Sequence, residues 1–234
     1  MKINLTKKFP KKVLAIVNTV GEIADKRTFR VYIVGGLVRD LLLGTSNYDL
    51  DFVVDGDGIE FAKALNGYLK GELKIHRAFK TATLMHKGLR IDISTARGES
   101  YKKPAAYPDV RPGTIKEDLF RRDFTINAMA VSVNKKTFGQ LIDLYGGAGD
   151  LKKGIIRVMH DKSFSDDPTR VFRAVRFSAR FDFKIESHTK DLIKKAVLSG
   201  LLGDVNRGRI KKEVDLFLKE KEPKKCFGMF ADLV

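Results

Sequence analysis

The chain has 234 residues, 43% of them hydrophobic, so it is long enough for one large or two small domains with a packed core. Its single cysteine, Cys226, excludes an intramolecular disulfide and suits a reducing cytoplasm. No apolar run approaches ~18 residues, so we expect no transmembrane helix. The formal net charge of +16 indicates a polyanionic partner, with nucleic acid as the leading candidate and a merely lysine-rich surface as the alternative.

The N-terminal part of the chain predicts helices and strands in alternation. Residues 13–25 carry apolar side chains on one side and predict an amphipathic helix. Residues 31–34 form a short apolar run typical of a strand, and residues 37–43 predict a second helix. Gly35 and Gly36 lie between them, where backbone N–H groups can approach a phosphate. Residues 44–47 are typical of a turn, and we expect the next strand to carry Asp49 and Asp51.

Asp49 and Asp51 are the first candidates for metal chemistry. Side chains two apart on a strand point to the same face, so these carboxylates should project together. Paired carboxylates bind a hard cation such as Mg²⁺ through oxygen. Two solvated aspartates beside a turn are the alternative, but the neighbouring glycine pair and helix favour a site for metal-assisted phosphoryl chemistry.

The remaining pattern up to residue 150 predicts a small mixed sheet with flanking helices. A helix is expected over 59–69, and short strands over 73–75, 81–85 and 89–94. In the last of these, Ile91 and Ile93 alternate with Asp92, which faces the other side. Asp92 becomes a third catalytic acid if its strand lies beside that of Asp49 and Asp51.

From residue 97 the pattern loses its period and then becomes helical. Residues 97–113 contain three prolines and predict a long mobile loop. A short helix at 116–122, a strand at 128–133 and a turn at 143–147 should complete the sheet-containing part. Farther on, Asp167 is expected to cap a helix with Pro168 at its first position. Further helices are predicted over 187–198 and 205–219.

Two later segments complete a set of three ordered motifs. The first is Arg-Arg-Asp at 121–123, followed by Asn127, and the second is Asp166-Asp167 with Arg170 and Arg173. With the glycine pair and the Asp-x-Asp, these closely resemble bacterial-type (class II) tRNA nucleotidyltransferases and their poly(A) polymerase relatives. That family belongs to the polymerase-beta-like nucleotidyltransferase superfamily. The resemblance covers residues 31–183.

The resemblance implies an α+β fold in two domains. Residues 1–150 would form a nucleotidyltransferase head on a small mixed sheet. Residues 151–234 would form an all-helical neck and the start of an RNA-binding body. Relatives continue into further helical regions that hold tRNA. We therefore expect either that this chain is a fragment of a longer protein or that a homo-oligomer or second chain supplies these regions.

The resemblance also implies roles for individual residues. Asp49 and Asp51 would hold the catalytic metals. Three residues would meet the sugar and phosphates of the incoming nucleotide: Arg122, Asp123 and, in support, Asn127. Base recognition would fall to Asp167 and Arg170, with Arg173 one turn farther on. Asp166 stands where the family usually has Glu, which keeps the charge.

Cationic side chains are needed to offset the negative charge of the triphosphate, whichever family the chain belongs to. Arg39, Arg122 and Arg173 are candidates for this role. We also assign Arg176 to the nucleotide, with a solvated basic helix face as the alternative for it. A structural salt bridge is the alternative for Arg122 and Asp123.

The resemblance implies a cytoplasmic enzyme, not associated with membranes, that uses Mg²⁺ as its cofactor. It would add C and A, as CCA or part of it, to the 3′ end of tRNA from CTP and ATP without a template. Within the same chemistry, the alternatives are a poly(A) polymerase and an enzyme that adds only CC or only A. From another class, the alternative is a catalytically silent RNA-binding module.

Overall fold

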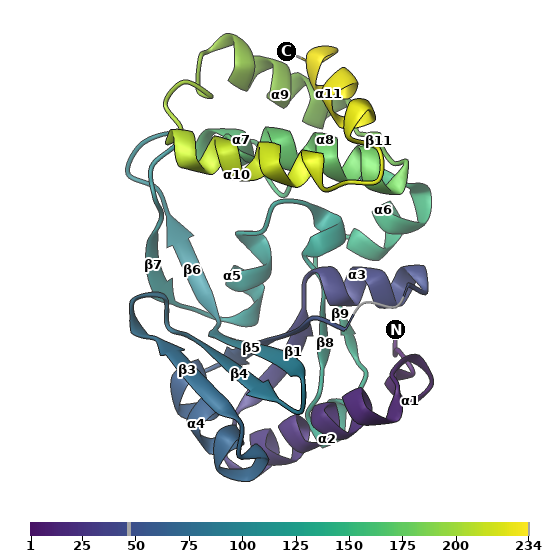
Figure 1. Cartoon of the computed structure of the whole chain (residues 1–234), viewed down its shortest axis with the longest axis vertical. Coiled ribbons are helices and arrows are strands. Elements are labelled where there is room, and N and C mark those ends of the chain that lie inside the picture. The colour runs from purple at the N-terminus through teal and green to yellow at the C-terminus, as the bar shows by residue number, and fades with distance from the viewer. Residues whose placement is uncertain (46–47, 234) are drawn as a thin grey trace. The chain divides into compact units, whose positions relative to one another are not determined.

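The chain forms two compact units in a computed structural model that describes residues 1–45 and 48–233 (Figure 1). The first unit consists of Met1–Gly98, Val110–Arg122 and Asn127–Tyr145. The second consists of Glu99–Asp109, Asp123–Ile126 and Gly146–Val234. The predicted division into 1–150 and 151–234 stays a prediction. In the described part of the chain, no helix combines the length and apolar character that crossing a membrane requires.

A seven-stranded mixed sheet forms the centre of the first unit, as predicted. Its strands stand in the order β3-β4-β5-β2-β1-β8-β9. Strands β2 and β5 run parallel, and the other neighbouring pairs are antiparallel. In sheet order, the strands span Glu72–His76, Thr81–His86, Leu89–Thr95, Leu50–Asp55, Arg30–Val34, Ala130–Ser132 and Leu141–Ile142.

The two faces of this sheet carry different helices. On one face, Val34 and Val53 pack with Leu119 of helix α5 (Ile115–Phe120). Helix α4 (Gly58–Leu69) packs against β4 and β5, and α2 (Lys11–Lys26) packs against β1 and α4. Strand β5 alternates as predicted, because Ile91 and Ile93 are buried while Asp92 is half-buried. The alternation therefore fixes which face presents Asp92.

The second unit is mostly helical, as predicted, with one short parallel strand pair. Its core is built from Phe172, Val175, Phe217 and Cys226, which are all buried. The pair consists of β10 (Ile155–Ile156) and β11 (Lys184–Ile185). The helices are α6 (Gly147–Lys153), α7 (Ser163–Asp166), α8 (Arg170–Phe181), α9 (Ser187–Leu198), α10 (Arg207–Leu218) and α11 (Pro223–Ala231).

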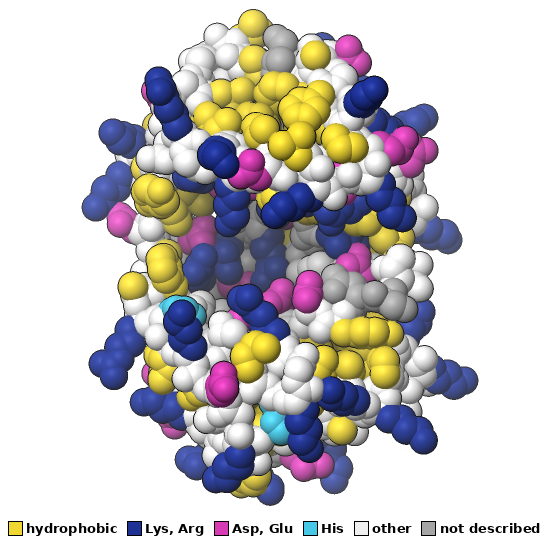
Figure 2. All heavy atoms as spheres, viewed as in Figure 1, with side chains coloured by type: hydrophobic (Ala, Val, Ile, Leu, Met, Phe, Trp, Pro, Cys, Tyr) yellow, Lys and Arg dark blue, Asp and Glu magenta, His cyan; other side chains and the backbone are white. Residues whose placement is uncertain are grey.

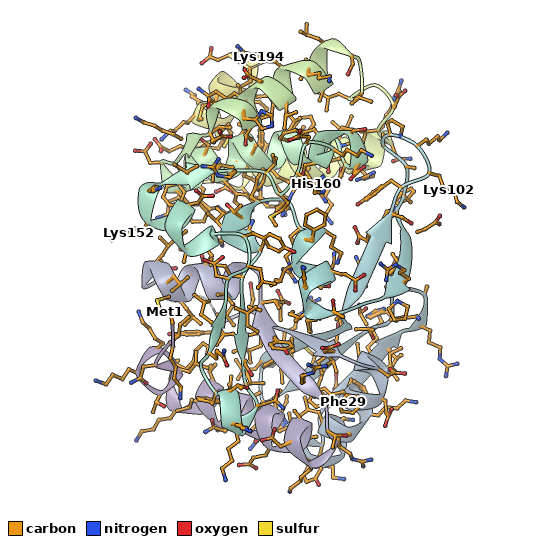
Figure 3. The ribbon with its side chains drawn as sticks, turned by 180° about the vertical axis from the view of Figure 1, so that it is seen from behind. Met1, Phe29, Lys102, Lys152, His160 and Lys194 are labelled. Atoms are coloured by element: carbon orange, nitrogen blue, oxygen red, sulfur yellow. The ribbon has the colours of Figure 1, made fainter. Side chains whose placement is uncertain are left out.

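The structure departs from the sequence predictions at several places. Residues 97–113 are not a structureless loop, because they form the two-stranded sheet of β6 (Arg97–Ser100) and β7 (Asp109–Pro112). Lys102, labelled in Figure 3, lies in the segment that joins these strands. The mobility of this segment stays a prediction. The sequence did not predict α6, α11 or the short α1 (Leu5–Lys8). Ser46 and Asn47 of the predicted turn lie outside the described residues.

Candidate active site

The glycine pair forms the turn between β1 and helix α3 (Gly36–Leu43), as predicted. Gly35 is the N-cap of α3 and has φ 69° and ψ −135°, a conformation that residues with a Cβ avoid. A Cβ on Gly35 would lie 2.9 Å from Nη1 of Arg122. A Cβ on Gly36 would lie 3.3 Å from Nη2 of Arg39. The absence of side chains therefore lets two guanidinium groups approach this turn.

Two of the three predicted acids stand opposite each other in the sheet. Asp51 on β2 is in register with Asp92 on the parallel strand β5. Residues in register on neighbouring strands point to the same face, so the condition set for Asp92, that its strand lies beside that of Asp51, is met. Asp49 precedes β2, which begins at Leu50, so its predicted place within the strand is wrong by one residue. All three carboxylates nevertheless line one pocket of about 270 Å³ together with Arg90.

Asp92 differs from Asp51 because neighbouring donors hold its carboxylate. Thr83 donates its hydroxyl to Oδ1 at 2.6 Å. Arg90 donates from Nε to Oδ2 at 2.7 Å and from Nη2 to Oδ1 at 3.2 Å. Arg90 therefore compensates the charge of Asp92 in this arrangement. The role of Asp92 as a third catalytic acid stays a prediction.

The electrostatics of Asp51 suit a divalent cation. Crowding by protein atoms and the negative charges of Asp92 and Asp49 raise the pKa of Asp51 to about 6, although Arg122 and Arg90 oppose the shift. A bound cation would relieve this repulsion, and carboxylate oxygens are its preferred protein ligands. Among residues 1–45 and 48–233, no three His, Cys, Asp or Glu side chains form a ready-made ligand set.

Asp51→Asn is expected to stabilise the metal-free protein at pH 7 and much less at pH 4. The folded pKa of about 6 lies above 3.8, the ordinary value for aspartate, so the folded state binds more protons and loses stability as pH rises between these two values. Asparagine removes this loss. The gain should stay below about 1 kcal/mol, since solvent screens an exposed carboxylate, and it should raise Tm by up to roughly 2–4 °C. Thermal unfolding at both pH values measures the difference, and an equal shift at pH 4 would contradict the prediction.

Arg122 lines a second pocket, of about 400 Å³, that also includes Asp51 and Asp92. The fully buried Asp118 accepts hydrogen bonds from Nη2 of Arg122 at 2.9 Å and Nη2 of Arg121 at 2.6 Å. Burial opposes ionisation of Asp118, but the two guanidinium groups hold its pKa below the usual value. Nε of Arg122 is buried and has no hydrogen-bond partner within the described residues. The guanidinium of Arg122 lines the pocket together with the carboxylates, and its positive charge suits a phosphate oxygen.

Arg39 and Asn127 are joined in the interior of the first unit. Both are about 5–6% exposed, and Nη1 of Arg39 donates to Oδ1 of Asn127 at 2.7 Å. Nε of Arg39 donates to Oδ1 of Asp40 at 2.8 Å. These bonds position Arg39 against the glycine turn, and its contact with a nucleotide stays a prediction.

Asp123 and Arg173 form an ion pair in the second unit. Nε of Arg173 donates to Oδ2 of Asp123 at 2.8 Å, and the backbone N–H of Phe124 donates to Oδ1 at 2.8 Å. The guanidinium of Arg173 also lies over the ring of Phe177, 5.3 Å from its centroid. Both predicted nucleotide-binding residues are thus held in fixed positions by each other.

Asp167 and Arg170 lie at the junction of α7 and α8. Thr169 is the N-cap of α8, so the predicted cap at Asp167 with Pro168 as first helical residue is wrong by two residues. Asp167 still accepts the backbone N–H of Thr169, at 3.0 Å. Arg170 is only 6% exposed and donates from Nη1 to Oγ of Ser163 at 2.7 Å. The two side chains therefore do not share a helix face, and their role in base recognition stays a prediction.

Arg176 is used within the second unit. It is 6% exposed, which rules out the alternative of a solvated helix face. Its Nη1 donates to Oε1 of Glu220 at 3.3 Å, and its guanidinium lies 4.8 Å from the ring centroid of Phe177. These contacts hold Arg176 within the second unit, and its contact with a nucleotide stays a prediction.

Sequence reasoning missed several residues that touch the predicted site residues. Asp118 precedes Arg122 by four positions on a helix, a spacing that indicates an ion pair and was readable. Arg90 is two residues from Asp92, so strand alternation already placed it on the same face. Arg209, which contacts Asp167 from 42 residues away, left no local signal.

The motifs and their geometry agree with a comparison to protein families. The profile described as "Poly A polymerase head domain" matches residues 31–157, more than half of the chain. The chain belongs to this family. The matched segment contains the glycine turn, the three acids, Arg122 and Asp123.

Named relatives within the family support the resemblance inferred from the motifs. An A-adding tRNA nucleotidyltransferase from Geobacter sulfurreducens is 44% identical over 230 residues, which is 98% of this chain and 26% of the relative. A CC-adding tRNA nucleotidyltransferase from Deinococcus radiodurans is 37% identical over 82% of this chain and 50% of its own length. The solved Thermotoga maritima CCA-adding enzyme complexed with tRNA_CCA is 46% identical, with a TM-score of 0.90 over all of this chain and 54% of that one. The chain thus spans between a quarter and about half of these family members.

Proposed function

We propose that the chain is the catalytic part of a template-independent RNA nucleotidyltransferase. It adds C, A or both to the 3′ end of tRNA, using CTP and ATP. The oxygen of the terminal 3′-hydroxyl attacks the α-phosphate, the bond from the α-phosphate to the bridging oxygen breaks, and pyrophosphate leaves. The hydroxyl proton is lost in the same reaction. Because tRNA is matured where it is made and used, we propose a cytoplasmic site of action.

The arrangement of Asp51 and Asp92 in register is the observation that carries this proposal. It places two carboxylates side by side, with Asp49 in the same pocket and Arg122 lining the adjoining one. Negative charge in such a pocket would repel a triphosphate unless a cation were bound. Crowding by protein atoms, and after it the negative charges of Asp92 and Asp49, raises the pKa of Asp51.

Mg²⁺ is the cofactor that fits these residues best, with Asp49 and Asp51 as its protein ligands. When bound in pairs, such ions acidify the attacking hydroxyl and stabilise the leaving oxygen. Arg122 supplies positive charge to the phosphates, and Asp118 holds it in place. The glycine turn lets this guanidinium lie close to the backbone.

The second unit would supply nucleotide selection and RNA contacts. Asp167 is the residue we assign to the base, because it carries an accepting carboxylate at the junction of α7 and α8. Lys and Arg side chains are spread over the face shown in Figure 2, and the exposed Lys152 and Lys194 point outward in Figure 3. Such a surface suits phosphate contacts.

The likeness to relatives favours one alternative within the same chemistry. The A-adding relative is 44% identical, whereas the CC-adding relative is 37% identical. Addition of A alone is therefore the second candidate, ahead of a poly(A) polymerase. A catalytically silent RNA-binding module is disfavoured because all three acids remain in one pocket.

The proposal is tested with three tRNA substrates, ending before CCA, after the first C and after CC. Each is incubated with one labelled nucleotide at a time and with Mg²⁺. Incorporation of C and A in order supports CCA addition, whereas incorporation of A only after CC supports the A-adding alternative. Long A tails on unrelated RNA would identify a poly(A) polymerase. Failure to incorporate any nucleotide would contradict an active enzyme.

RNA affinity is expected to fall steeply with salt. A chain with a net charge of +16 should bind RNA largely through phosphates and release counterions. The affinity for tRNA should drop at least about tenfold between roughly 50 and 200 mM salt. Fluorescence anisotropy with labelled tRNA measures this slope. An affinity that did not change with salt would point to a binding mode other than phosphate contacts.

A further inference from the structure

Arg209 of α10 lies outside the motifs of the chain but contacts the residue assigned to the base. Its Nη2 donates to Oδ1 of Asp167 at 2.7 Å. The side chains are 23% and 25% exposed, so the pair is largely shielded from water. We propose that Arg209 is a positioning residue that orients Asp167 for base selection. This inference rests on the proposed function, because Arg209 would position a residue of the same base-recognition site.

The hydrogen bonds to Asp167 are distributed unevenly between its two oxygens. Oδ1 accepts from the backbone N–H of Thr169 at 3.0 Å, from the hydroxyl of Thr169 at 2.6 Å and from Arg209. No hydrogen bond within the described part of the chain falls on Oδ2. Three donors thus fix one oxygen, and the other stays available as an acceptor. An exocyclic amino group of cytosine or adenine matches such an acceptor.

Asp167 depends on a side-chain partner because of where it lies in the chain. It is the C-cap of α7, with an extended backbone at φ −138° and ψ 94°, and α8 begins only at Arg170. A carboxylate is symmetric about its last torsion, so a single neighbour cannot distinguish its oxygens by shape. Thr169 restrains Oδ1 from its own chain segment. Among the described residues of α10, Arg209 alone donates a hydrogen bond to Asp167, and a charged hydrogen bond is stronger than a neutral one.

A second contact fixes the guanidinium of Arg209. Its Cζ lies 5.4 Å from the ring centroid of Tyr107, in the segment between β6 and β7. The planar guanidinium is therefore held between an aromatic face and a carboxylate, an arrangement that suits arginine better than lysine. Tyr107 itself is 72% exposed, so its ring is not committed to the core. The geometry assigns Arg209 the role of a fixed donor rather than a mobile surface charge.

The test compares Arg209→Ala and Arg209→Lys with a matched control, Lys211→Ala. Lys211 lies two residues away on the same helix, is exposed and pairs only with Asp215 within the described residues. Equilibrium binding of CTP, ATP, UTP and GTP to the full chain is measured with Ca²⁺ in place of Mg²⁺. The same proteins are then assayed for kcat and KM with each nucleotide.

Arg209→Ala should reduce the preference for CTP and ATP over UTP and GTP by about tenfold, the effect of losing one charged hydrogen bond. Arg209→Lys should restore part of this preference, and Lys211→Ala should leave it unchanged. The change should appear in relative binding and KM rather than in a uniform loss of kcat. An equal loss for all four nucleotides, as expected of a merely structural residue, would overturn the inference, as would unchanged selectivity.

Binding and transfer separate this inference from the proposed function. A wild-type chain that binds CTP and ATP selectively but transfers nothing to tRNA would refute the proposed function, while the Arg209 comparison by binding would still stand. A wild-type chain without any nucleotide preference would overturn the inference directly, because there would be no selection for Arg209 to support.

Discussion

Asp49→Ala and Asp51→Ala are each expected to lower nucleotide transfer by more than about a hundredfold while the protein stays folded. Removing one oxygen ligand should cost the reaction several kcal/mol of charge stabilisation, and each ~1.4 kcal/mol is a factor of ten in rate. Both residues are exposed at the start of β2, so no core contact is lost. Single-turnover transfer with primer tRNA and saturating ATP or CTP measures the effect.

Asp51→Asn and Asp55→Ala sharpen this experiment. Asparagine keeps the shape of Asp51 but removes its charge, so a comparable loss would show that charge rather than packing matters. Asp55 lies at the other end of β2 and forms an ion pair with the exposed Arg30 at 3.3 Å. Asp55→Ala should therefore retain near wild-type transfer. Retention of more than a few per cent of activity by Asp51→Ala would refute the metal assignment.

The sequence predicted most of this site because its key features are local. The glycine pair directly after an apolar run predicted the turn at Gly35, where the backbone has a positive φ. Strand alternation gave the common direction of Asp49 and Asp51. The register of Asp51 with Asp92 was not predictable in this way. This register requires β5 to pair with β2, although β3 and β4 lie between them in the sequence. Only long-range packing determines that pairing.

The misplaced predictions have a similar physical origin. Residues 97–113 look irregular because their prolines and glycines obscure the usual strand pattern. The two short strands form by pairing with each other, and no apolar alternation marks them in the sequence. Arg176 looks like a surface cation from its helix position, yet Glu220 from a segment 44 residues later buries it. Helix α11 was missed because its apolar residues join a core cluster with Phe172 and Phe217, which no local window contains.

Asp167→Asn is expected to shift nucleotide choice from CTP and ATP toward UTP and GTP. Cytosine and adenine present an amino donor beside a ring-nitrogen acceptor, whereas uracil and guanine present a carbonyl acceptor beside a ring N–H donor. With Oδ1 held by Thr169 and Arg209, Oδ2 is the oxygen left to accept from the amino group. Asparagine can keep the held oxygen and places an NH₂ donor where Oδ2 was.

The size of the effect follows from the cost of mismatched polar groups. A buried group left unpaired costs about 1–3 kcal/mol, so an unfavourable donor–donor contact should reduce CTP and ATP use roughly ten- to a hundredfold. Asp167→Ala should lose selectivity without reversing it, and it should also destabilise the protein by about 1 kcal/mol through the lost bond to the Thr169 N–H. Competition among the four nucleotides measures the ratio directly.

Asp161→Asn is the matched control for this reversal. Asp161 also lies in the second unit, but its carboxylate is exposed and pairs with His188 at 2.8 Å. The same change of charge there should leave nucleotide choice unaltered. If Asp167→Asn and Asp167→Ala both kept wild-type discrimination, Asp167 would have no part in base recognition, and the carboxylate would serve only to join α7 and α8. A reversal confined to Asp167→Asn would instead identify Oδ2 as the acceptor that reads the base.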